Sequence, residues 1–207
     1  MCYNRRKMAK KRAYHHGNLR QALVREAART IQARGVEHLT LRAVAESLGV
    51  SRTALYRHFT DKAALLAAVA REGFQQFRGN LEQAWTDGGR GFAGFEAMGL
   101  AYLQFALRNR AHYRVMFGGF KELCGRDAEL EADAESAFQV LVGALVTLQQ
   151  SGDATPGDPV ELARFVWAAS HGVAMLTIDG QLGPDPAAGE ALMKLSIGRL
   201  KTALSRA

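Results

Sequence analysis

Apolar residues recur along most of the chain at spacings of three and four, the period of a helix that buries one face. The first such stretch covers residues 19–34, with Asn18 expected to cap its start and Gly35 its end. Its apolar positions are Leu19, Leu23, Ala27 and Ile31. No stretch predicts a strand convincingly, so the pattern favours an all-α protein.

Two short helices are expected next, joined by a turn around a glycine. Their predicted ranges are 41–48 and 52–59, with Thr40 and Ser51 as N-caps. Gly49 lies in the turn, where a left-handed backbone suits glycine better than residues with a β-carbon. Two helices of this length joined in this way match the helix-turn-helix pattern of DNA-binding proteins.

The rest of the chain predicts further helices, separated by breaks rich in glycine, proline and polar residues. Their expected ranges are 62–85 with Asp61 as N-cap, 92–108, 111–117, 127–150, 160–182 and 186–205, for about nine helices in all. We therefore expect a three-helix DNA-binding domain over 14–61 and a helical ligand-binding and dimerisation domain over 62–207. Residues 1–13 are predicted to be a disordered basic arm.

The charge of the chain is divided unevenly between its two parts. Residues 1–80 carry 16 Lys and Arg against five Asp and Glu, whereas residues 81–207 carry 11 against 15. Without residues 1–12 the first part still has a net charge of +5, so its positive charge is not confined to a tail. A basic head on a mildly acidic body predicts that the head binds a polyanion.

Composition argues against several other classes of protein. Two cysteines, Cys2 and Cys124, supply neither a disulfide framework nor metal-ligand spacing. No apolar stretch reaches the roughly 18 residues of a membrane span. The expected setting is the cytoplasm, with no membrane contact, metal or cofactor. The chain also lacks a P-loop, a nucleotide-binding glycine motif, a nucleophile elbow and a zinc signature, which disfavours an enzyme.

Two stretches resemble a known family. The run LTLRAVAESLGVSRTALYRHFTDKAALL, residues 39–66, resembles the DNA-binding signature of the TetR family of regulators, and residues 14–35 resemble that family's first helix. FVWAASHG, residues 165–172, resembles the signature of its WHG-type C-terminal domain, which YRVMFGG at 113–119 also suits. The resemblance implies a dimeric DNA-binding transcriptional regulator, more often a repressor than an activator, that responds to a small-molecule effector. A DNA-binding regulator or architectural protein without an effector is the alternative.

The helix predicted at 52–59 would read bases in the major groove of double-stranded DNA. Arg52 and Arg57 can each bind guanine O6 and N7, and Thr53 can contact thymine. The resemblance implies that Arg42 also reaches a guanine, although a solvated face is the alternative for these arginines. Phosphate contacts are expected from Thr40, Ser51, Tyr56, His58 and Lys62.

One recognition helix reads only a few base pairs, so a homodimer on a palindromic operator is expected. The resemblance implies that the helices 160–182 and 186–205 form its interface. Candidate interface residues, for which intramolecular packing is the alternative, are Leu162, Val166, Ala169, Val173, Leu192, Leu195 and Arg199.

The ligand pocket is expected among the helices of the C-terminal domain. Its candidate lining residues are Phe105, Met116, Phe117, Phe138, Trp167, His171 and Met175. Phenylalanine and methionine at helical spacing are also typical of a packed core, whereas a histidine one turn from a tryptophan can supply a polar anchor. Because this set holds few charges, we expect an uncharged or weakly polar effector.

Overall fold

The computed structural model describes residues 16–119, 123 and 127–204. Helices cover most of these residues, and no strand occurs in the described ranges, which confirms the prediction of an all-α protein. The arm predicted at 1–13, Cys2, Cys124 and most of the connection expected after Gly119 lie outside the described residues.

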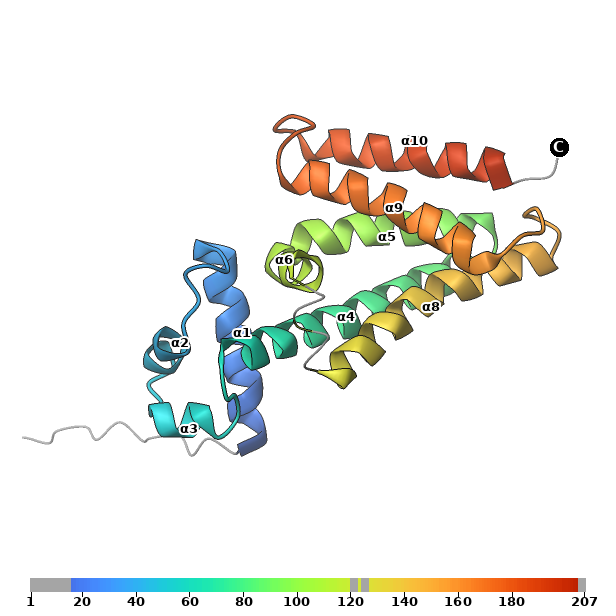
Figure 1. The fold of residues 1–207 in the computed structure, drawn as a ribbon. Coiled ribbons are helices and arrows are strands. Elements are labelled where there is room, and N and C mark those ends of the chain that lie inside the picture. The colour runs from blue at the N-terminus through green and yellow to red at the C-terminus, as the bar shows by residue number, and fades with distance from the viewer. Residues whose placement is uncertain (1–15, 120–122, 124–126, 205–207) are drawn as a thin grey trace, which may run out of the picture.

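The N-terminal head consists of α1 (His16–Arg34), α2 (Leu41–Ser47) and α3 (Arg52–Tyr56), which lie together at one end of the molecule (Figure 1). Two of the predicted caps are confirmed: the hydroxyl oxygens of Thr40 and Ser51 accept hydrogen bonds from backbone N–H groups of the helices they begin, both at 3.1 Å. Asn18 is not a cap, because the backbone is already helical at His16.

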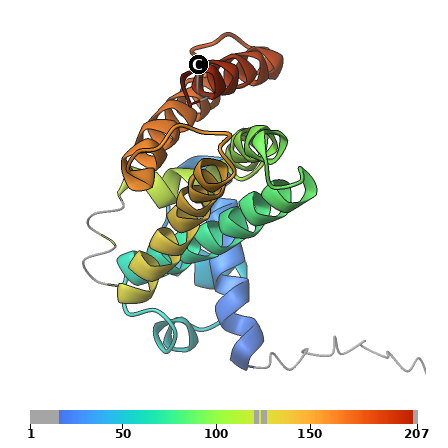
Figure 2. The ribbon, with the colours of Figure 1, turned by 90° about the vertical axis from the view of Figure 1, so that its right-hand side faces the viewer.

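The body is built around α4 (Lys62–Asp87), a helix of 26 residues that begins in the head. The other helices are α5 (Phe92–Arg108), α6 (Arg110–Gly118), α8 (Ala128–Gln150), α9 (Pro159–Ile178) and α10 (Pro186–Leu204). Helices α1, α5, α6 and α8 pack directly against α4, whereas α9 and α10 pack against α5. Both views place α10 far from the head (Figures 1 and 2).

Two helices end several residues earlier than predicted. Helix α3 ends at Tyr56, three residues early, because the chain turns there and brings Phe59 into the core. Helix α9 ends at Ile178 rather than at 182, because Gly180 has a left-handed backbone (φ +70°) that breaks the helix. The turn predicted at Gly49 is confirmed by its φ of +65°.

Candidate DNA-binding surface and ligand cavity

Helix α3 presents a polar face to solvent because its apolar side is buried. Leu55 is buried in the head, and Phe59 follows it into the same core. The opposite side is exposed, as predicted for residues that would contact the bases or phosphates of DNA; it carries Arg52, Thr53, Tyr56 and Arg57.

Polar contacts fix α2 and α4 against the rest of the head. Glu26 of α1 is 9% exposed and accepts hydrogen bonds from the Ser47 hydroxyl at 2.6 Å and from Arg29 at 2.7 Å and 2.8 Å. The Arg29 hydrogen bond is the main cause that lowers the pKa of Glu26. Lys62, at the start of α4, donates to the Val36 carbonyl at 2.8 Å. These contacts join α1 to α2, and the start of α4 to the segment that follows α1.

Three predicted DNA contacts lie in settings that the sequence did not indicate. Arg42 is exposed but its Nε donates to Glu46 at 2.7 Å, one turn along α2. Lys62 is half-buried against the Val36 carbonyl, so part of its donor capacity is used within the protein. His58 is half-buried and lines a hollow of about 230 Å³ between the head and the start of α8.

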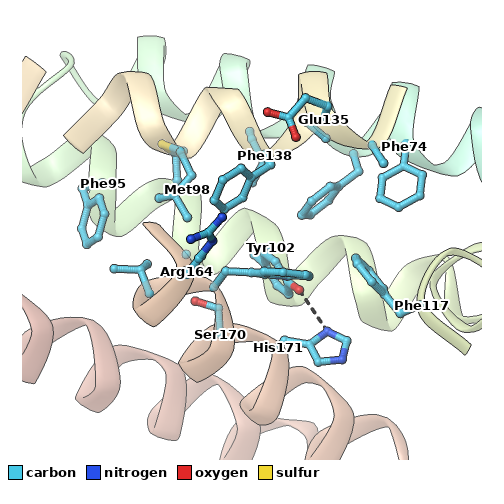
Figure 3. Close-up of a pocket in the computed structure, with 18 of the residues that line it drawn as sticks. Phe74, Phe95, Met98, Tyr102, Phe117, Glu135, Phe138, Arg164, Ser170 and His171 are labelled. Carbon is cyan, nitrogen blue, oxygen red and sulfur yellow. Dashed lines mark hydrogen bonds between the residues drawn. The ribbon is translucent and has the colours of Figure 1, made fainter. Parts of the chain in front are cut away.

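The body contains a cavity of about 870 Å³. Its walls come from α4, α5, α8 and α9, with the end of α6 and one residue of α10 completing them. Figure 3 shows α8 and α9 on opposite sides of it. Seven aromatic side chains line the cavity: Phe74, Phe77, Phe95, Tyr102, Phe117, Phe138 and Trp167.

A polar cluster lies at one side of this aromatic cavity. The Tyr102 hydroxyl is 3.0 Å from the Tyr113 hydroxyl and 3.3 Å from Nδ1 of His171, as Figure 3 shows for the latter contact. The Tyr113 hydroxyl approaches the same Nδ1 to 2.7 Å. Burial raises the pKa of both tyrosines and lowers the pKa of His171, so the three groups carry no charge at neutral pH.

The structure places four of the seven predicted lining residues at the cavity: Phe117, Phe138, Trp167 and His171. The other three do not line it. Phe105 and Met116 are at most 1% exposed and belong to the packed core, where Phe105 contacts Phe77 and Met116 fills the space beside Gly73. Met175 also packs against this core, one turn beyond His171 on α9.

Apart from His171, sequence reasoning missed the polar residues of the cavity. Tyr102 and Ser170 lie within apolar helical stretches, and only the fold brings them to the wall. Three charged residues also line the cavity, Glu131, Glu135 and Arg164, and all of them are exposed. The expectation that the lining holds few charges therefore applies to its buried part and not to its open side.

The outer face of α9 and α10 carries unusually exposed apolar side chains. Phe165 is 61% exposed and Leu195 57% exposed, and Leu176 is exposed as well. Of the predicted interface residues, Leu195 and Arg199 are exposed and Leu162, Ala169 and Leu192 are half-buried. Val166 and Val173 are each 6% exposed, so they pack inside the protomer, which is the alternative that the sequence left open.

Two other kinds of site have no candidate among the described residues. No group of three or more His, Cys, Asp and Glu side chains there has an arrangement that could hold a metal ion. None of the described helices is long and apolar enough to cross a membrane.

Family comparisons match both parts of the chain. A family model described as bacterial regulatory proteins of the tetR family matches residues 23–69. Another, described as a tetracyclin repressor-like C-terminal domain, matches residues 95–200.

Individual relatives extend this similarity. Tetracycline repressor protein class A from transposon 1721 of Escherichia coli is 30% identical over 66% of this chain and 69% of that protein. Tetracycline repressor protein class C of Escherichia coli is 49% identical over 25% of this chain, but the match spans only 23% of that protein. HTH-type transcriptional repressor AcnR of Corynebacterium efficiens is 42% identical over 27% of this chain and 29% of its own length.

Solved structures share the whole fold. A protein of unknown function from Rhodococcus sp. RHA1 has a TM-score of 0.84 and 32% identity, covering 95% of this chain and all of that chain. The TetR family transcriptional regulator PfmR from Thermus thermophilus has a TM-score of 0.68 and 19% identity, with 89% of this chain and 99% of that chain covered. Because PfmR is only 19% identical to this chain, its similarity concerns the fold alone.

Proposed function

Because the chain belongs to the TetR family of bacterial regulators, we propose that it is a repressor that releases its operator when a small molecule occupies the cavity. The coarser function, a DNA-binding transcriptional regulator, follows from the family. The relatives named as repressors support the direction of regulation. The proposal of a small-molecule effector rests on the cavity of about 870 Å³, a volume within the 300–1,000 Å³ typical of ligand sites.

The head would bind DNA through α3. Arg52, Thr53 and Arg57 project from one exposed face and would enter the major groove, where an arginine can bind guanine with two hydrogen bonds. Thr40, Ser51, Tyr56, His58 and Lys62 would contact phosphates and fix the register. Arg42 would have to leave Glu46 to reach a base. That exchange has a small cost, because an exposed ion pair contributes little to stability.

A homodimer would place two copies of α3 on successive turns of a palindromic operator. The outer face of α9 and α10 is the surface that we assign to the partner, because Phe165, Leu176 and Leu195 are exposed there. Gly172 lies on the same face of α9, and a β-carbon added to it would meet no atom within 4 Å. The protomer's own packing therefore does not require glycine at this position, whereas close approach of a partner helix would.

Helix α4 would transmit the signal. Phe74, Phe77 and Leu81 of α4 line the cavity, and the same helix begins at Lys62 beside the recognition helix. An effector that favours one packing of α4 would shift the spacing of the two α3 helices in the dimer. This works only if the effector binds the released conformation better than the DNA-bound one.

The cavity argues against the alternative of a regulator without an effector. Protein interiors are packed nearly without voids, so a body with only a structural role would be expected to fill this volume. Here the space remains open, and aromatic rings and neutral polar groups line it.

Selection of bound duplexes from a random DNA pool, followed by a compound screen for operator release, tests this function. We expect enrichment of a palindrome and at least one compound that releases it. Ala137, 3% exposed, faces the cavity from α8, so Ala137→Phe should keep DNA binding but lose the response to that compound. Failure to enrich any sequence, or release that is equal in Ala137→Phe, would contradict the proposal.

A further inference from the structure

Ser170 differs from most serine and threonine side chains inside the long helices. Thr30, Ser136, Thr147, Thr177 and Thr202 each donate to the carbonyl four residues earlier in their own helix, at 2.7–3.0 Å. Ser170 makes no such bond and no other hydrogen bond with the residues that the structure describes, although only 6% of its surface is exposed. Its oxygen is not one of the fully enclosed polar atoms that lack a partner, so water or a ligand in the cavity can reach it.

That hydroxyl belongs to the wall of the cavity. Ser170 lines the cavity from α9, directly before His171, and Figure 3 shows it on the side of the cavity that α9 forms. The Tyr102 hydroxyl, bonded to Nδ1 of His171, lies on the same wall. The Tyr102 hydroxyl is already bonded within the polar cluster, whereas the Ser170 hydroxyl is available to a molecule bound in the cavity.

The ionisable side chains of the polar cluster beside Ser170 carry no charge at neutral pH. Tyr102, Tyr113 and His171 are neutral there, since burial shifts the pKa of each away from its charged form. The charged lining residues, Glu131, Glu135 and Arg164, are exposed at the open side of the cavity. A carboxylate or an ammonium group bound to Ser170 would gain an opposite charge only if it also reached Arg164 or one of the two glutamates, and would otherwise lose its hydration without compensation.

The remaining surface favours flat rings. Phe138 and Trp167 meet edge to face at 6.0 Å between centroids, and Phe74 and Phe117 do so at 5.6 Å. Ring edges and faces presented in this way suit an aromatic guest better than a saturated one, because aromatic pairs gain from offset and edge-to-face contact.

We propose that the effector is an aromatic compound whose uncharged hydroxyl or carbonyl oxygen binds the Ser170 hydroxyl. This inference rests on the proposed function only in taking the cavity as the effector site. It goes beyond it by naming the neutral oxygen group, the residue that recognises it and the aromatic body that the walls enclose.

Isothermal titration calorimetry of the full chain, without DNA, tests the chemistry with matched probes. The set is 4-phenylphenol, 4-acetylbiphenyl, biphenyl, biphenyl-4-carboxylate, biphenyl-4-methylamine and the saturated 4-cyclohexylcyclohexanol. We expect the phenol or the ketone to bind best, at least about tenfold more tightly than either charged compound. Tighter binding of a charged compound or of the saturated alcohol, or no binding by any compound, would overturn the proposal.

Variants then test whether the oxygen of the ligand binds Ser170. Ser170→Ala should weaken the phenol or ketone roughly two- to tenfold and leave biphenyl unchanged, as expected for one neutral hydrogen bond. Ser136→Ala is the matched control, since its hydroxyl is bonded within α8 and should affect no ligand. Equal affinities in Ser170→Ala and the parent would refute the assignment. A compound that binds as expected but leaves DNA affinity unchanged would contradict the proposed function and not this inference.

Discussion

The Tyr113 hydroxyl lies 2.7 Å from Nδ1 of His171, and the two rings stack with their centroids 5.6 Å apart. The contact joins α6 to α9 behind the cavity, and Tyr102 brings α5 into the same cluster. Helix α6 in turn packs against α4. These side chains therefore form a continuous set of contacts from the cavity to α4. A ligand that contacts Tyr102 or His171 could displace α4, the helix that begins in the head, through them.

Tyr113→Phe should lower the free energy of unfolding by about 1–3 kcal/mol, because it leaves the buried Nδ1 of His171 with a weaker set of partners. Urea denaturation at pH 7.5 measures this loss. Tyr56→Phe is the control: Tyr56 is 53% exposed, and its change should stay within about 0.5 kcal/mol. Equal stabilities of Tyr113→Phe and the parent would show that the cluster contributes nothing to the fold.

His112 gives the stability a pH dependence that can be removed by mutation. Its Nε2 is buried and has no hydrogen-bond partner in the described part of the chain, and burial lowers its pKa despite nearby Glu72. The unfolded chain therefore binds a proton more readily, so His112 destabilises the fold as the pH falls below about 6.5.

His112→Leu should weaken that acid sensitivity. We expect the free energy of unfolding of the variant to exceed that of the parent, and by more at pH 6 than at pH 8, in urea titrations at both values. A constant difference between the variant and the parent would mean that His112 does not titrate differently in the two states.

Arg52 and Lys62 should differ in what they contribute to DNA binding. Arg52→Ala is expected to relax specificity at one base position, at about 1–3 kcal/mol for the preferred base. Lys62→Ala should weaken all sequences similarly, flatten the salt dependence by about one unit and also destabilise the head through loss of the Val36 bond.

Fluorescence anisotropy with the selected operator and its single-base variants, at several salt concentrations, separates these effects. Arg78→Ala is the control, since Arg78 lies in the body, paired with Glu82. Parental affinity and specificity in Arg52→Ala and Lys62→Ala would show that the DNA contacts are assigned wrongly.

Gly172→Leu should convert the dimer to monomers, because a side chain there finds room in the protomer but would block a partner helix. Phe165→Glu should do the same by placing a charge in the interface. Gly143→Leu on α8, where the space is also open, is the control and should remain dimeric. Light scattering coupled to size exclusion reports the mass, and a dimeric Gly172→Leu would exclude this face of α9.

Local features of the fold could be predicted from the sequence because they depend on neighbouring residues. The caps at Thr40, Ser51 and Asp61 are confirmed, since each side chain accepts from a backbone N–H three residues later. The bounds of α5 were also predicted correctly, because Gly91 and Asn109 flank a long apolar stretch.

The cavity could be predicted only in part, because its wall depends on which apolar face of each helix turns inward. Helical spacing groups Phe105 with the lining, but the fold turns it towards Phe77. The same spacing cannot separate Val166, which faces inward, from Phe165, which faces solvent. The Tyr102 and His171 contact spans 69 positions along the chain, and no local pattern indicates it.

Occupation of the cavity and binding of DNA are expected to be coupled through α4. The most direct measurement is a closed cycle: operator affinity with and without a compound that calorimetry has shown to occupy the cavity, and affinity for that compound with and without operator. Because coupling between two sites is reciprocal, each ligand should weaken binding of the other by the same factor, between about 5-fold and 150-fold. Operator affinity that stays the same with every compound that fills the cavity would contradict it.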